Sequence, residues 1–90
     1  MPLGGKHRRT LVALFSEPVS GTIPWKEVEN LLRALGAELS EGRGSRVRLH
    51  LNGVKAVFHR PHPRKETGKE AVKSMRRFFL EAGVHAEGEE

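Results

Sequence analysis

The chain has 90 residues, no cysteine and a formal net charge of +5 at neutral pH. This length limits it to one small domain with a modest core, and the lack of cysteine excludes disulfides and thiolate metal sites. No apolar run approaches the roughly 20 residues that cross a bilayer, and the first residues lack the apolar segment of a secretory signal. We therefore expect a soluble, cytoplasmic protein that does not contact membranes.

The positive charge is concentrated in one segment. Residues 1–42 hold 5 Lys/Arg and 5 Asp/Glu, whereas residues 43–77 hold 11 Lys/Arg and only two glutamates, so that the second segment carries +9. Such a segment is typical of a protein that binds a polyanion, because each phosphate it neutralises releases condensed counterions. A solvated basic surface without an anionic partner explains the composition equally well.

The first two predicted elements are helices. In residues 7–18, apolar side chains recur at helical spacing and Pro18 follows, which predicts a short N-terminal helix. In residues 23–36, Pro24 suits a first helical turn and Gly36 a C-terminal stop. The predicted core face of this second helix consists of Trp25, Val28, Leu32 and Leu35.

A short strand within residues 37–45 and a β-hairpin are predicted next. Asn52-Gly53 lies between two alternating runs and predicts a two-residue turn, since both central residues need a positive φ. The turn determines the register. The predicted apolar pairs are Leu51 with Val54, Leu49 with Ala56 and Val47 with Phe58, and the pairs on the other face are Arg46 with His59, Arg48 with Val57 and His50 with Lys55.

The last predicted element is a helix. The sequence "TGKE", Thr67 to Glu70, matches a capping box, and Gly83 marks the helix end. Its predicted core face consists of Val72, Met75, Phe79 and Ala82.

The order helix, "GAELSEGRGSR", hairpin, "FHRPHP" and a helix ending in "LEAGV" resembles the HicA family of bacterial toxins. The resemblance spans residues 23–84 and is most specific at Gly44-Ser45, at Pro61-His62 and at the "AG" that closes the last helix. It implies an α+β domain with an αβββα double-stranded-RNA-binding-domain-like fold, in which a three-stranded antiparallel sheet packs on two helices. A short N-terminal helix is added here. The expected boundaries are an extension over residues 1–22, the HicA-like domain over 23–84 and an acidic tail over 85–90.

The resemblance also implies a function. HicA-like toxins are metal-independent mRNA interferases that need no cofactor and are neutralised by a HicB-type antitoxin that covers the active face. In the family pattern a catalytic histidine follows the Gly-Ser pair, but this chain has Arg46 there. Arginine can hold a phosphate but cannot accept a proton near neutral pH. His59, opposite Arg46, or His50, two pairs away on the same face of the hairpin, can serve as the base instead.

Three functions remain open at the level of sequence. The first is an RNA-cleaving toxin with weakened or lost catalysis, the second a non-catalytic RNA-binding module, and the third a protein that docks an acidic antitoxin-like partner. Both histidines can equally be ordinary polar residues of an exposed strand. His59 and His62 have H-x-x-H spacing but no third ligand, so no metal site is expected. The residues expected to contact RNA are Arg43, Ser45, Arg46, Arg48, Lys55, His62, Lys69 and Lys73.

Overall fold

The computed structural model describes residues 3–62 and 64–85 and has the predicted α+β architecture. The elements in chain order are α1 (Gly5–Phe15), β1 (Ile23–Pro24), α2 (Trp25–Ala34), β2 (Glu38–Glu41), β3 (Arg46–Leu51), β4 (Val54–His59), β5 (Glu66–Thr67) and α3 (Lys69–Glu81).

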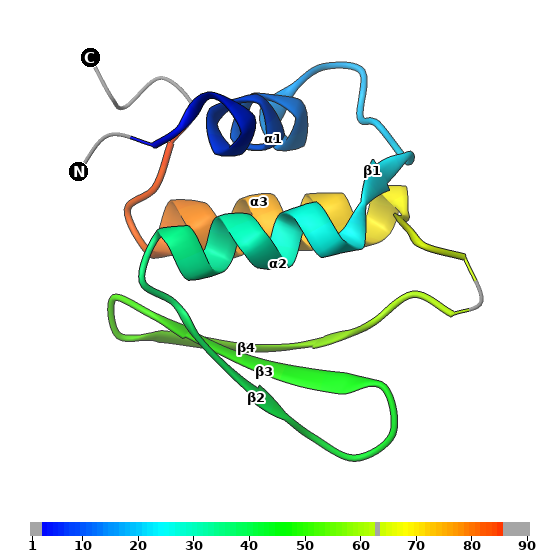
Figure 1. Cartoon of the computed structure of the whole chain (residues 1–90), viewed down its shortest axis with the longest axis vertical. Coiled ribbons are helices and arrows are strands. Elements are labelled where there is room, and N and C mark those ends of the chain that lie inside the picture. The colour runs from blue at the N-terminus through cyan, green and yellow to red at the C-terminus, as the bar shows by residue number, and fades with distance from the viewer. Residues whose placement is uncertain (1–2, 63, 86–90) are drawn as a thin grey trace.

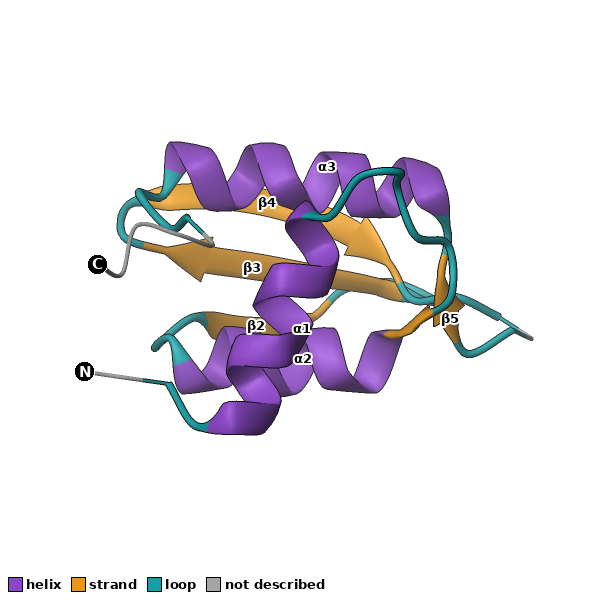
Figure 2. Ribbon diagram, turned by 90° about the horizontal axis from the view of Figure 1, so that it is seen from above, coloured by secondary structure: helices purple, strands orange, loops and turns teal. Residues whose placement is uncertain are grey.

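The elements form three layers (Figure 1). Strands β2, β3 and β4 form an antiparallel sheet in that order, and α2 and α3 lie on one of its faces. Helix α1 lies on the far side of α2 and α3 and crosses over them (Figure 2). No described element covers the other face of the sheet, which is therefore open to a partner.

The hairpin has the predicted turn and register. Asn52 and Gly53 have φ values of 51° and 83°, as a two-residue turn requires. All six predicted pairs between β3 and β4 are present, from Arg46 opposite His59 to Leu51 opposite Val54. Because side chains alternate along a strand, the apolar set faces the helices and the basic set faces away from them.

The core joins the sheet to α2 and α3 through aromatic side chains. The Phe58 ring centroid lies 6.1 Å from that of Trp25 and 6.4 Å from that of Phe78. The fully buried aliphatic and aromatic side chains around them are Val28, Leu31, Leu32, Val47, Val72, Met75 and Phe79. Trp25, Phe58, Phe78 and Phe79 are therefore core residues, so they do not offer stacking surfaces for bases.

Helix α1 is held by apolar contacts and by one arginine. Leu11 and Leu14 are buried against the other two helices. Arg76 of α3 donates hydrogen bonds to the carbonyls of Leu14 and Ser16, just where α1 ends, and pairs with Glu17 at 2.6 Å. These carbonyls have no partner within the helix, so Arg76 acts as a C-terminal cap supplied from another element.

Two details of the sequence prediction are wrong. The capping box does not form, because Gly68 occupies the N-cap position and no side chain caps α3. Thr67 instead pairs with Ile23 in a two-stranded sheet of β1 and β5 that was not predicted, and its side chain is buried. Pro24 precedes α2 as its N-cap, with a ψ of 130°, and is not in the first helical turn.

Candidate functional site

The open face of the sheet brings most of the predicted site residues together. We use this name for the outward side chains of the three strands: Glu38 and Ser40 from β2, Arg46, Arg48 and His50 from β3, and Lys55, Val57 and His59 from β4. All are exposed, and Val57 near the centre is 56% accessible. The two ends of this face differ in charge.

At one end, His50 lies between a carboxylate and an ammonium group. Glu38 on β2 and Lys55 on β4 are its direct cross-strand partners. The Glu38 Oε1 atom is 3.7 Å from His50 Nδ1. A positive charge on this row is therefore already balanced within the protein. Glu38 was not among the predicted site residues, although its place in the strand before the hairpin puts it beside β3.

At the other end, Arg46 and His59 face each other, and no acidic residue of the described strands lies across from them. The β2–β3 ladder ends at Glu41 opposite Val47, so no β2 residue pairs with Arg46. His59 Nδ1 lies 3.5 Å from the hydroxyl of Ser45. Among the described residues no carboxylate pairs with Arg46 or His59. This end therefore combines a cation, an imidazole and a hydroxyl, and its charge is unbalanced.

The two histidines cannot act on the same phosphate. They lie four rows apart on the hairpin, which at a strand rise of about 3.3 Å per residue is about 13 Å. Arg48 lies between them, and its Nη1 donates to the backbone oxygen of Glu41 at 3.1 Å. A single reacting group on this face would therefore contact His59 or His50, but not both.

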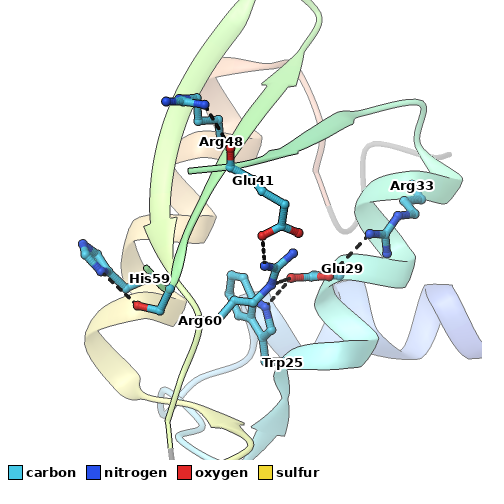
Figure 3. Close-up of polar contacts among 8 residues, drawn as sticks. Trp25, Glu29, Arg33, Glu41, Arg48, His59 and Arg60 are labelled. Atoms are coloured by element: carbon cyan, nitrogen blue, oxygen red, sulfur yellow. Dashed lines mark hydrogen bonds and ion pairs between the residues drawn. The ribbon is translucent and has the colours of Figure 1, made fainter. Parts of the chain in front are cut away.

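Behind the Arg46 end, Arg60 ties the end of β4 to two other elements (Figure 3). Its Nε donates to Glu29 of α2 at 2.7 Å, and its Nη1 donates to Glu41 of β2 at 2.6 Å. Glu29 is only 8% accessible and also accepts a 2.6 Å hydrogen bond from Trp25 Nε1. Arg33 lies 3.6 Å from the same carboxylate.

This network shifts two pKa values. The hydrogen bond from Arg60 lowers the pKa of Glu41, and the bonds to Glu41 and then Glu29 raise the pKa of Arg60. The backbone N–H of Arg60 also donates to the backbone oxygen of Ser45 at 2.9 Å. Arg60 thus anchors both segments that carry the His59–Ser45 pair. Sequence reasoning missed it, and the available signal was Glu29, an acidic residue one turn after Trp25 on an otherwise apolar helix face.

The other predicted RNA-contacting residues lie off the open face. Arg43 is exposed in the turn between β2 and β3. His62 and Lys69 line a hollow beside the start of α3. Lys73 lies one turn further along α3 and is 3.8 Å from Glu70. Because α3 packs on the covered side of the sheet, Lys69 and Lys73 do not lie on the open face.

Over residues 3–62 and 64–85, no three His, Cys, Asp or Glu side chains come together as a metal site. No helix within the same ranges is both long enough and apolar enough to span a membrane.

Fold and site together define a small basic α+β protein with an open β-hairpin face. Residues 25–84 match the family model described as the HicA toxin of bacterial toxin–antitoxin systems. The match covers 60 of 90 residues, and the chain belongs to this family. Membership implies a cognate antitoxin. The same comparisons found no matching curated protein and no matching solved structure.

Proposed function

We propose that the chain is an RNA-binding toxin that cleaves RNA weakly and without a metal ion, with His59 as the base and Arg46 as the phosphate contact. The observation that carries this proposal is the Arg46 end of the open face, where a cation and an imidazole lie opposite each other and no carboxylate of the described residues pairs with either. Arginine carries a positive charge at all ordinary pH values, and no described carboxylate pairs with Arg46. A bound phosphate would supply the missing counter-ion.

His59 is better placed than His50 to act as the base. In the tautomer in which Nδ1–H of His59 donates to the Ser45 hydroxyl, Nε2 keeps a free lone pair. His50 instead lies 3.7 Å from Glu38, whose carboxylate would repel an approaching phosphate. We therefore assign catalysis to His59, and we assign to His50 only a place on the face.

The chemistry needs only these residues and water. His59 Nε2 takes the proton of a ribose 2′-hydroxyl, and the 2′-oxygen attacks the adjacent phosphorus. The bond from phosphorus to the 5′-oxygen breaks, leaving a 2′,3′-cyclic phosphate, and the departing oxygen takes a proton from water. Arg46 stabilises the charge that develops on the phosphoryl oxygens.

The remaining basic residues would bind the RNA backbone. Arg48 and Lys55 continue the cationic surface along the hairpin, and Arg43 extends it into the adjacent turn. Contacts of this kind fix the register of the RNA without reading its sequence. Residues 23–84 would form the RNA-binding domain, with residues 1–22 as an extension of it and 85–90 as an acidic tail.

The proposal is tested by incubating the purified protein with mixed RNA in EDTA. The parent should release cyclic-phosphate ends slowly, and His59→Ala should abolish this while RNA binding persists. His50→Ala is the matched control, because it removes an imidazole from the same face at the other end of the hairpin, and it should leave the cleavage rate unchanged.

Arg46→His restores the family residue on the same row. Because His59 already serves as the base in this proposal, Arg46→His should change the cleavage rate little. A rise of about 10²-fold, the usual scale for a positioned acid or base, would mean instead that Arg46 is what disables the chemistry. If the parent and Arg46→His both bind RNA without cutting it, the chain is a non-catalytic RNA-binding module. If His50→Ala abolishes cleavage and His59→Ala does not, the base has been assigned to the wrong end.

A further inference from the structure

The edge of β4 carries backbone hydrogen-bonding groups that none of the described strands satisfies. β4 is the last strand of the sheet, and its only described strand partner is β3. In a hairpin with a two-residue turn, Leu51 and Val54 exchange the first pair of ladder bonds, and bonded rows then alternate with non-bonded ones. The N–H and C=O groups of Lys55, Val57 and His59 therefore point outward, away from β3.

Bonds at the far end of the hairpin support this assignment. The Arg60 N–H donates to the backbone oxygen of Ser45 at 2.9 Å, so the Ser45–Arg60 row, which follows the Arg46–His59 row, is a bonded one. Gly42 N–H donates to Arg46 O at 2.9 Å, so the Arg46 backbone faces β2 and not β4. The alternation thus holds over the whole of β4.

The free edge borders a groove shared with α3. The groove has a volume of about 460 Å³ and is lined on one side by residues 55–59 and on the other by α3. Its α3 side consists of the apolar or small residues Ala71, Ser74 and Phe78 together with Arg77 and two glutamates, Glu70 and Glu81. Acidic side chains of a bound strand would therefore lie on the side of the open face, and apolar ones would face α3. β4 has six residues without proline, so it lacks a common feature that keeps edge strands from pairing. An added strand would fit between β4 and α3.

We propose that this groove binds an extended, acidic segment of the antitoxin by strand addition to β4. Alternate side chains of such a strand would point to opposite faces. One set would enter the groove against Phe58 and Phe78, and the other would lie beside Lys55 and His59 on the open face. The fitting segment therefore alternates apolar with acidic residues.

Charge favours this occupant over a second copy of the chain. Two β4 strands paired about Val57 would set Lys55 of each copy beside His59 of the other and would bring two basic faces together. The segment from 43 to 77 carries +9, so self-pairing would be opposed by charge, whereas a carboxylate-bearing strand is attracted to it. The inference rests on the antitoxin that family membership implies, and it does not depend on RNA cleavage.

Amide hydrogen exchange followed by NMR tests the proposal with an octapeptide of alternating valine and glutamate at millimolar concentration. The amides of Lys55, Val57 and His59 should exchange quickly in the free protein and at least about tenfold more slowly with peptide, because binding adds hydrogen bonds to these groups alone. Those of Ala56 and Phe58, already bonded to β3, should be slow in both states. A matched valine–lysine octapeptide should leave all five amides unchanged.

Two variants, each with a matched control, distinguish a loss of strand addition at the β4 edge from a loss of the fold. Val57→Pro removes an outward N–H while keeping the ladder to β3, and should abolish the peptide effect; Val57→Ala, its matched control, should retain it. Ser74→Arg should block the groove, whereas Leu80→Arg, on an exposed position of α3 outside the groove, should not. Equal protection by both peptides, or no protection by either, would overturn the proposal. Protection that rises with protein concentration alone would assign the edge to self-association instead.

Discussion

The Arg60 network allows a quantitative prediction about stability. Arg60→Ala removes the guanidinium that compensates the Glu29 carboxylate, which is 8% accessible. Removing one partner of a buried ion pair costs about 3–5 kcal/mol. We expect a loss at the lower end, about 3 kcal/mol, because Trp25 Nε1 still donates to Glu29 and Arg33 stays 3.6 Å away. At about 4–8 °C per kcal/mol for a chain of this size, the melting temperature should fall by about 12–24 °C.

The assay is urea unfolding followed by Trp25 fluorescence, with thermal unfolding by circular dichroism as a second probe. Glu41→Gln is the control, because it weakens the exposed contact of Arg60 and leaves the contact with Glu29. A loss below about 1 kcal/mol for Arg60→Ala, the value of an exposed pair, would refute the assignment of Arg60 to a buried network.

Three further predictions concern the pH dependence, the turn and the basic face. Arg60 lowers the pKa of Glu41 in the folded protein. The stability that Glu41 contributes is therefore complete above its ordinary pKa of 4.5 and is lost as pH falls through the lowered value. Melting temperatures measured against pH should show the parent and Glu41→Gln converging in acid. Gly53→Ala should cost about 1–2 kcal/mol in urea unfolding because φ is +83°. Gly5→Ala, inside α1 where an added Cβ meets only ordinary contact, should not destabilise the protein, because alanine is the better helix former. Arg46→Ala and Arg48→Ala should each flatten the dependence of log RNA affinity on log salt by about one unit, and an unchanged slope would mean that neither touches phosphate.

Most of the fold was predictable because strong local signals agreed with one another. Asn52-Gly53 determines the turn, and alternation then assigns every side chain of β3 and β4 to a face. The two-stranded sheet of β1 and β5 was missed for a physical reason. Strands of two residues are too short to show a period, and their pairing of Ile23 with Thr67 joins segments that are far apart in sequence. The same pairing draws Thr67 into a strand and leaves Gly68 to begin the helix.

The candidate site was predictable only in part. The hairpin register places Arg46 opposite His59, but the difference between the two ends of the open face depends on β2. Glu38 reaches His50 because β2 pairs with β3 from Glu38 to Glu41, and no local turn signal specifies that register. Arg60 presents a similar difficulty. In the sequence it is one more cation in a basic run, and only tertiary packing brings it to Glu29 and Glu41.

Arg60 also links stability to the proposed chemistry, and the two effects can be separated. It follows His59 directly, and its backbone donates to the residue whose hydroxyl lies 3.5 Å from the imidazole. Losing its side-chain anchors would leave that backbone bond possible but would free the end of β4 to move relative to β2. Well below its melting temperature, a folded Arg60→Ala protein should therefore keep its affinity for RNA, which depends on charge along the whole hairpin, and lose cleavage rate, which depends on the position of one imidazole. A parallel loss of both would mean that the network supports the fold alone.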